Sequence, residues 1–424
     1  MIITIILVIL ALLGTPLFVV IATGALLGFY FSEIDLQVMA IEFYRITEMP
    51  VLVAIPLFTF AGYLLSESGA PHRLVRLTNA LFGWMPGGLA IVSLVACAIF
   101  TAFTGASGVT IVALGALLYP AMAQAGYKEN FSLGLVTTSG SLGLLFAPAL
   151  PLILFAVIAQ QLGIGKPFSI DDMFLAGILP GILMLTLLAF WSIYHRPPRS
   201  TQQFSWKEAG GALREAIWEV PLPIVVLGGI YSGYFAISEA AAVTAFYVLV
   251  VEMLFYREIP FSQLPRIMRE SMVLVGGILV ILGVSLASTN YLIDQEVPTQ
   301  LFEWIQSKVD SKLTFLVLLN IFLLLLGTML DIFSALVLIV PLLLPIAIGY
   351  GIDPVHLGII FLANMQIGYF TPPVGMNLFI ASYRFNKPVI QLYKATLPWF
   401  FILLAAVLVI TYWPSLSLWL PGRL

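Results

Sequence analysis

Charged side chains are scarce in this sequence. They make up 9% of its 424 residues, whereas about a quarter of the residues of an ordinary soluble domain are charged. Hydrophobic residues reach 61%, and the mean hydropathy is +1.07. A water-soluble fold has too little interior to bury this much apolar surface. The composition therefore predicts an integral membrane protein.

The few charges are balanced and form no basic tract. The 18 Lys and Arg residues are matched by 21 Asp and Glu residues, which gives a net charge of −3. Binding to nucleic acid requires a basic surface that neutralises phosphates. We therefore expect the lipid bilayer, and no nucleic acid, among the partners.

Residues that bind metals or form cross-links are also rare. The single cysteine, Cys97, excludes a disulfide within the chain and a thiolate metal cluster, and we expect it to be a small apolar filler. His72, His195 and His356 lie far apart and form no HExxH pattern, and His356 is expected on the surface. Paired carboxylates and a nucleophile motif are missing as well. We expect neither an enzyme nor an organic cofactor.

Long apolar stretches account for most of the chain. A transmembrane helix needs about 20 apolar residues, and no stretch alternates with the period of two that a β-barrel strand requires. The fold is therefore expected to be all-α. The first stretch lacks the basic n-region of a signal peptide, and Gly14 and Pro16 could divide it into two short helices. The apolar stretches are 2–31, 49–65, 87–103, 109–123, 131–160, 173–194, 220–236, 237–256, 272–289, 313–329, 332–350, 355–383 and 396–419.

Lys and Arg are concentrated in a few connections, which predicts the orientation. The positive-inside rule places these connections on the cytoplasmic face and the acidic connections 32–48 and 290–311 on the outer face. Segment 204–219 mixes aromatic residues with charges, which favours an amphipathic helix in the cytoplasmic interface, with an ordinary polar loop as the alternative. The basic residues are Arg73, Arg76, Arg196, Arg199, Lys207, Arg214, Arg257, Arg266, Arg269, Arg384, Lys387 and Lys394.

Two halves of the chain share unusual features at an offset of 224 to 225 positions. Pro120 aligns with Pro345, and Gly143 aligns with Gly368. Each half contains an apolar pair joined by a short tip, at about 87–123 and about 313–350. Each pair could be two full spans or a re-entrant hairpin. Because the charges place the two pairs on opposite faces, we expect an inverted repeat: 1–203, an arm helix at 204–219, and 220–424.

Each half also contains an apolar helix interrupted by glycine and proline. The interruptions are TTSGSLGLLFAPALP (137–151) in the helix at about 131–160, and NMQIGYFTPPVGMN (364–377) in the helix at about 355–383. Breaks of this kind free backbone groups, which are tolerated in hydrocarbon only where protein, ion or substrate satisfies them. Freed carbonyls and hydroxyls suit sodium, and half-helix N-termini suit an anion. The alternative is a pair of proline-kinked helices packed by small residues.

Tips and breaks therefore supply the candidate binding residues. Asp331 is the one carboxylate within a long apolar context, and it could bind an ion, cap the following helix, or do both. Candidate substrate- and ion-binding residues are Thr104, Gly105, Ser107, Ser139, Gly140, Ser141, Gly143, Pro148, Thr328, Asp331, Asn364, Gly368, Thr371, Pro372, Pro373, Gly375 and Asn377. Candidate sodium ligands among them are Ser107, Ser139, Gly143, Asp331, Asn364, Gly368 and Thr371.

The chain resembles the large membrane subunit of TRAP (tripartite ATP-independent periplasmic) transporters over nearly its whole length. The strongest match is GYFTPPVGMNLFIAS (368–382), supported by IPLFTFAGYLL (55–65), LGGIYSGYFAISEAAAVTAFY (227–247), LDIFSALVLIVPLLLPI (330–346) and SLGLLFAPALPLILF (141–155). It departs from the family pattern at Ala147-Pro148, where consecutive prolines are usual, and at the first tip, which reads TGAS rather than a serine-richer form.

The resemblance implies an elevator transporter in the inner membrane of a bacterium or archaeon. It implies sodium-driven import of a small organic acid that a periplasmic substrate-binding protein delivers. It also implies a partner, a small membrane subunit of about four helices. Alternatives are a stand-alone sodium- or proton-coupled anion carrier, an intramembrane enzyme and a purely structural subunit.

Overall fold

The computed structural model describes residues 7, 9–10, 14–85, 87–195 and 204–422. These residues form helices joined by turns, with no strand among them, which confirms the all-α prediction. Seven of the described helices are long and apolar enough to cross a membrane, or up to nine when each of two bent pairs counts as one span. The helices are α2 (Leu17–Phe31), α3 (Gln37–Arg45), η1 (Ile46–Glu48), η2 (Pro50–Val53), α4 (Ala54–Glu67), α5 (Ala70–Phe82), α6 (Gly88–Thr104), α7 (Ser107–Ala113), α8 (Gly115–Gln124), α9 (Glu129–Ser139), η3 (Leu142–Leu145), α10 (Leu150–Leu162), α11 (Ile170–Tyr194), α12 (Trp206–Glu215), α13 (Pro221–Tyr231), α14 (Ile237–Val250), η4 (Val251–Phe255), α15 (Leu264–Asp294), α16 (Val297–Gln306), α17 (Lys312–Met329), α18 (Ile332–Gly349), α19 (Pro354–Gly368), α20 (Met376–Phe385), α21 (Val389–Tyr412) and α22 (Ser415–Leu418).

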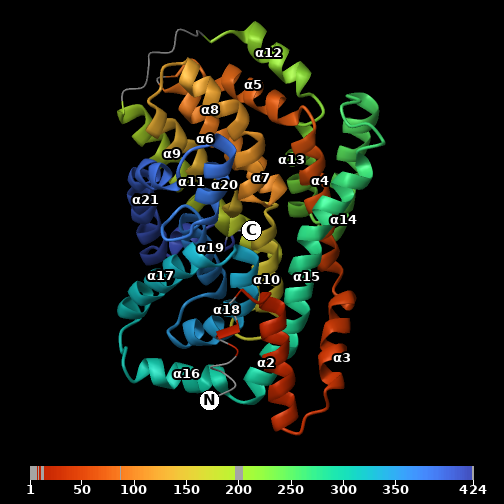
Figure 1. The fold of residues 1–424 in the computed structure, drawn as a ribbon, viewed down its shortest axis with the longest axis vertical. Helices are drawn as coiled ribbons and strands as arrows, with labels where there is room; N and C mark the ends of the chain where they lie inside the picture. The colour runs from red at the N-terminus through yellow and green to blue at the C-terminus, as the bar shows by residue number, and fades with distance from the viewer. Residues whose placement is uncertain (1–6, 8, 11–13, 86, 196–203, 423–424) are drawn as a thin grey trace.

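The helices form two groups that lie side by side in Figure 1. On the right, α2, α3 and α4 pack along the long helix α15, and α4 also packs against α14. On the left and in the centre, α9 and α11 pack against α21, α17 packs against α19, and α10 packs against α18. Contacts of α4 with α6 and of α15 with α18 join the two groups.

The helices that carry several of the basic residues, α5, α12 and the start of α15, lie at the upper end of the molecule in Figure 1. Arg76 of α5 forms ion pairs with Glu208 and Glu215 of α12, and Arg266 of α15 forms one with Glu67 of α4. The acidic connections, between α2 and α3 and between α15 and α16, lie at the opposite end. The basic and acidic connections therefore occupy the two separate ends that the sequence predicts.

Two helical hairpins enter the bundle from opposite ends (Figure 1). The first runs from α6 through a tip at Gly105–Ala106 to α7 and α8, which are bent by 47° to each other. The second runs from α17 through Leu330–Asp331 to α18. Thr104 and Ser107 beside the first tip and Thr328 beside the second are at most 3% exposed, whereas Met329 at the second tip is 69% exposed. By length and composition α17 and α18 could each cross a membrane, and the bent pair α7 and α8 is either a broken span or a re-entrant loop, so both alternatives remain predictions.

Two helices are interrupted at the places where the sequence predicts breaks. The first consists of α9, η3 and α10, and its two parts are bent by 41° to each other. The second consists of α19 and α20, separated by residues 369–375. Each break contains one cis X–Pro bond, Ala147–Pro148 and Pro372–Pro373. The two breaks share this bond, although the first lacks the double proline.

Two amphipathic helices were not expected from the sequence. Both α5 and α16 fall in segments that were interpreted as connections, the basic one with Arg73 and Arg76 and the acidic one at 290–311, and each leads directly into a hairpin. They lie at opposite ends of the molecule in Figure 1. Their starts, at Ala70 and Val297, are separated by nearly the repeat offset, so they extend the inverted repeat. Their low hydropathy hid them from a search for apolar stretches.

The structure decides several smaller predictions. Cys97 is buried among apolar side chains, as expected. His356, expected on the surface, is 3% exposed, and its ring nitrogens bond to Ser417 Oγ and the Thr411 carbonyl. That prediction is wrong because α22 folds back against α19. In the first apolar stretch, α2 begins directly after Pro16, while residues 1–6, 8 and 11–13 lie outside the described residues.

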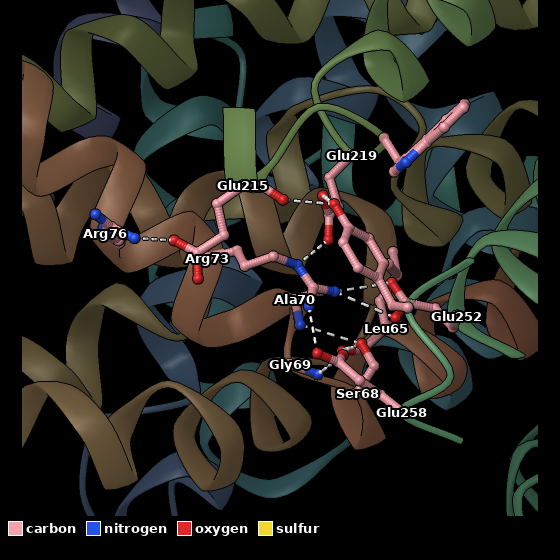
Figure 2. A network of polar contacts seen from close by, with 12 residues as sticks. Leu65, Ser68, Gly69, Ala70, Arg73, Arg76, Glu215, Glu219, Glu252 and Glu258 are labelled. Carbon is pink, nitrogen blue, oxygen red and sulfur yellow. Dashed lines mark hydrogen bonds and ion pairs between the residues drawn. The ribbon is translucent and has the colours of Figure 1, made fainter. Parts of the chain in front are cut away.

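A buried arginine holds the upper end together (Figure 2). Arg73 of α5 is 5% exposed and forms ion pairs with Glu219, Glu252 and Glu258. Its Nη2 lies 3.2 Å from Glu252, which is fully buried in the π-helical turn η4. Glu258 also accepts from the Gly69 amide at 2.6 Å. One guanidinium therefore ties α5 to the connections after α12 and after α14.

We predict that Arg73→Ala destabilises the protein more than any exposed arginine substitution at this end. The change leaves Glu252 buried without a counter-ion, and breaking a buried ion pair from one side costs roughly 3–5 kcal/mol. Thermal unfolding in detergent measures the effect. Arg269→Ala, at an exposed position in the same region, is the control and should change stability by less than about 0.5 kcal/mol. Equal melting midpoints for the two variants would contradict the prediction.

Candidate functional site

The first hairpin tip contacts the second broken helix through a pair of side chains. Ser107, the first residue of α7, donates from Oγ to Oδ1 of Asn377 in α20 at 2.7 Å. The amide nitrogen of the Asn377 side chain donates to the carbonyl of Thr137 in α9 at 3.4 Å. Asn377 is fully buried. It therefore links the first tip with both broken helices.

The same tip packs closely against the first break. Thr101 Oγ1 donates to the carbonyl of Gly140 at 2.9 Å. A Cβ atom at Gly143 would lie 2.3 Å from the carbonyl oxygen of Ala98, which leaves room only for glycine. Gly105 has a φ of +64° and ends α6, so the tip turns at a residue that readily adopts left-handed backbone geometry.

The second tip contacts the second break mainly through the backbone. The amide of Gly375 donates to the carbonyl of Thr328 at 3.0 Å. A Cβ atom at Gly368 would lie 2.5 Å from Cα of Gly327, so α17 and α19 meet at these two glycines. Tyr369 adds a side-chain contact, because its hydroxyl oxygen accepts from the Ile332 amide at 2.7 Å.

Asp331 serves as a helix cap in this structure. Its Oδ1 accepts from the amides of Phe333 and Ser334, each at 3.0 Å, at the start of α18. Of the two roles that the sequence left open, the structure shows the capping role. A capping carboxylate satisfies amides that would otherwise have no partner.

The two breaks also contact each other. Ser141 Oγ donates to the carbonyl of Gln366 at 3.1 Å and to that of Thr138 at 3.2 Å. With the contacts above, the two tips and two breaks form one continuous region. These four segments lie in two distant halves of the sequence, and the structure brings them together.

Other predicted residues make only local contacts in the region. Ser139 Oγ donates to the Val136 carbonyl at 3.3 Å, and Thr371 Oγ1 donates to the Ile367 carbonyl at 2.8 Å. Each hydroxyl oxygen keeps lone pairs that could accept from a ligand. Pro148 is buried, whereas Pro372 and Pro373 are exposed, so the prolines shape the breaks from different environments.

Several buried oxygens in this region have no hydrogen-bond partner among the described residues. A buried polar atom without a partner costs about 1–3 kcal/mol, and each such atom in a folded protein calls for an explanation, such as a bound ion or ligand. The atoms are Thr104 Oγ1, Thr137 Oγ1, Thr138 Oγ1, Asn364 Oδ1 and Gln366 Oε1. Oxygen atoms of this kind are the ligands that hard cations prefer.

Two polar residues that contact this region, Asn320 and Thr411, were missed in the sequence analysis. The Asn364 amide donates to Oδ1 of Asn320 at 2.7 Å, and Thr411 Oγ1 donates to the same oxygen at 3.1 Å. Asn320 lies in the apolar run LNIFLLLL of α17, and that setting was the available signal. The contact turns Asn364 toward α17 and leaves its Oδ1 unpartnered.

The region contains no formal positive charge. Segments 104–108, 137–151, 328–331 and 364–377 have no Lys or Arg, and the described residues contain no cluster of His, Cys, Asp and Glu that could hold a metal ion. Positive potential comes instead from helix N-termini, because α7 and α20 begin beside the Ser107–Asn377 contact. Such termini attract anions.

The chain matches a protein-family model over residues 3–416, described as the tripartite ATP-independent periplasmic transporter, DctM component. The chain belongs to this family. The resemblance seen in the sequence is thereby confirmed. A DctM component is part of a transporter and not an enzyme, so that expectation is confirmed as well.

Relatives of known name agree with the DctM assignment. The C4-dicarboxylate TRAP transporter large permease protein DctM of Pseudomonas aeruginosa is 35% identical over 405 residues, covering 95% of this chain and 93% of that protein. The protein of the same name in Rhodobacter capsulatus is 33% identical and covers 93% of this chain and 92% of its own. The ectoine/5-hydroxyectoine large permease UehC of Ruegeria pomeroyi is 29% identical over 97% of this chain and 96% of that protein.

A solved structure shares the fold of this DctM chain. The YdaH transporter of Alcanivorax borkumensis superposes with a TM-score of 0.65 over 89% of this chain and 87% of that chain. The sequences are only 15% identical, so the similarity supports the architecture and says nothing about the substrate.

We predict that Gly368→Ala destabilises the site through a steric clash. The added Cβ meets the backbone of Gly327, which has no flexible end to move aside, and overpacking of this kind costs about 1–3 kcal/mol. Thermal unfolding in detergent is the measurement. The matched control is Gly277→Ala, at an exposed position of α15 with nothing within 4 Å of the added Cβ. That change should be neutral or stabilising by up to about 1 kcal/mol. A Gly368→Ala protein as stable as the Gly277→Ala protein would refute the close approach.

Proposed function

We propose that the chain is the translocating subunit of a sodium-coupled importer of small organic acids across the inner membrane. It receives its substrate from a periplasmic binding protein and works with a small membrane subunit of about four helices. The observation that carries the proposal is the meeting of two tips and two breaks at one site with unpartnered buried oxygens. Inverted repeats with interrupted helices are typical of secondary transporters that bind near the membrane midplane.

Sodium is proposed as a co-transported substrate held by neutral oxygens. The candidate ligands are the hydroxyl, carboxyl, amide and carbonyl oxygens of Ser107, Ser139, Gly143, Asp331, Asn364, Gly368 and Thr371. The unpartnered oxygens of Thr104, Thr137 and Thr138 lie in the same region and add to the available donor set. A cation would relieve the desolvation cost of these atoms.

The organic acid is proposed to bind beside the N-termini of α7 and α20. Helix dipoles alone compensate an anion only partly, and charge in a low-dielectric site is expensive to leave unbalanced. Because the site has no Lys or Arg, bound sodium would supply the remaining positive charge. Substrate and sodium would then bind together, which is the basis of coupled transport.

The two helix groups of Figure 1 support an elevator movement. Both tips and both breaks belong to the left group, which would move as one body, while α2–α4 and α13–α15 would form the fixed scaffold. The named relatives transport C4-dicarboxylates and ectoines, and on that basis we propose a substrate in the same small-acid class. A stand-alone carrier that needs no binding protein is the alternative.

Uptake into proteoliposomes tests the proposal. The vesicles contain this chain with its small subunit, and radiolabelled C4-dicarboxylates or ectoine are supplied with or without the binding protein and an inward sodium gradient. We expect uptake only when both are present. Unchanged uptake without sodium would overturn the coupling, and uptake without the binding protein would favour the stand-alone carrier.

We predict that Asn377→Ala reduces sodium-driven uptake by at least tenfold and leaves the protein folded. The change removes the link between the first tip and both breaks, and losing hydrogen bonds at one site costs roughly 1–3 kcal/mol. Initial uptake rates and melting midpoints are measured on the same preparations. Asn130→Ala, at the exposed start of α9, is the control and should transport normally. A variant that is missing from the membrane, or that transports like the control, would contradict the assignment.

A further inference from the structure

A second polar cavity lies between the two helix groups, apart from the tips and breaks. Its volume is about 220 Å³, and its walls come from α3 and α15 on one side and from α10 and α18 on the other. It lies toward the acidic end of the molecule, in the lower half of Figure 1. The volume exceeds that needed for a single water molecule, so there is room for a small organic molecule.

The cavity has a positively charged side chain, which the region of the tips and breaks lacks. Arg45 lines it, and its Nη1 lies 3.6 Å from Oε2 of Glu42, one turn earlier on α3. That separation is too long for a hydrogen bond. Since the Arg45 side chain is 59% exposed, its guanidinium donors remain available to a ligand. Guanidinium binds carboxylates well because its planar donors match the two carboxylate oxygens.

Further polar groups complete the lining. Ser285 is 4% exposed, and its Oγ has no hydrogen-bond partner among the described residues. Oε1 of Gln161 and Oε2 of Glu42 are likewise buried without one. Thr289 and Asn290 line the same wall of α15. The cavity thus offers donors at Arg45, Ser285 and Asn290, and acceptors at Glu42 and Gln161.

We propose that this cavity is a second substrate site, which binds the organic acid before it reaches the tips and breaks. Arg45 binds the carboxylate, and the side-chain oxygens of Glu42 and Gln161 accept hydrogen bonds from a hydroxyl or nitrogen donor on the same molecule. The ligand class is therefore a small carboxylate that also carries a hydrogen-bond donor. A simple inorganic anion without a hydrogen-bond donor is disfavoured because it would leave the buried acceptors of Glu42 and Gln161 unpartnered. The inference rests on the proposed function and adds a delivery site to it.

The test is equilibrium binding of radiolabelled L-malate and succinate to the detergent-solubilised complex with its small subunit, in sodium-free medium. The two acids share a four-carbon skeleton and differ by one hydroxyl. We expect sodium-independent binding in which malate is preferred by roughly threefold to tenfold, the value of about one hydrogen bond. Arg45→Gln should weaken both ligands by at least about tenfold, because a charge-assisted bond is lost.

Two further variants separate binding from folding. Ser285→Ala removes a hydroxyl without a partner, so it should leave the melting midpoint unchanged and still weaken malate binding. Lys166→Gln, at an exposed position in the connection after α10, removes a positive charge outside the cavity and should leave binding within about twofold of the unmodified protein. Asn377→Ala should keep this sodium-free binding, because it alters only the tip region.

Four results would overturn the inference. The first is an unchanged malate affinity in Arg45→Gln, and the second is loss of sodium-free binding in Asn377→Ala. The third is the absence of sodium-free binding in a complex that does import. The fourth is loss of the small subunit from the Arg45→Gln complex, which would make Arg45 an assembly contact. Failure of the proposed function gives a different result, since the complete system with its binding protein would then import nothing in any medium.

Discussion

The structure depends on one constraint, which is that a backbone interrupted inside an apolar bundle must find partners without water. Each tip and each break ends a helix and frees amides and carbonyls that cost free energy if they stay unpaired. The interruptions satisfy one another: Gly375 donates to Thr328 of the second tip, and Ser141 donates to Gln366 across the breaks. Asn377 then joins the first tip to both. Such mutual pairing requires the four segments to meet, so the site follows from the need to satisfy the backbone.

Close contact between the interruptions requires small residues at defined positions. Gly143 packs on the backbone of α6, and Gly368 packs on Gly327 of the second tip, at distances that exclude a Cβ atom. These two glycines align in the repeat, so each half makes the same kind of contact between its hairpin and its broken helix. In this packing, side-chain oxygens of Thr104, Thr137 and Asn364 are buried without a hydrogen-bond partner among the described residues. Under the proposed function, the cation and the anion would therefore bind where these glycines bring the hairpins and the broken helices together.

The sequence predicts those features of the fold and the site that depend on short stretches of the chain. Apolar length, glycine and proline are local signals, and they correctly placed the all-helical fold, both tips and both breaks. Partners distant in sequence gave no such signal. Arg73 could not be matched to Glu252, which lies 179 positions away, and the burial of His356 depends on the fold-back of α22. The helices α5 and α16 were missed because an amphipathic helix lying at one end of the bundle has the hydropathy of a loop.

The two arm helices are related by the repeat but are held differently. Among the described residues, α5 is fixed by the ion pairs of Arg73 and Arg76 to three separate segments, whereas α16 takes part in no ion pair. Its contacts are mainly with α15 and α18, which belong to different helix groups. Breaking the buried ion pairs of Arg73 would leave buried charges unpaired, which costs much free energy. Apolar contacts between two helices carry no such penalty, so α16 can slide more easily than α5. Under the proposed elevator movement, α5 would therefore keep its place on the scaffold, and the change in geometry would concentrate around α16. The cavity beside Arg45 lies between the same two groups, so its walls would separate or close as that movement occurs.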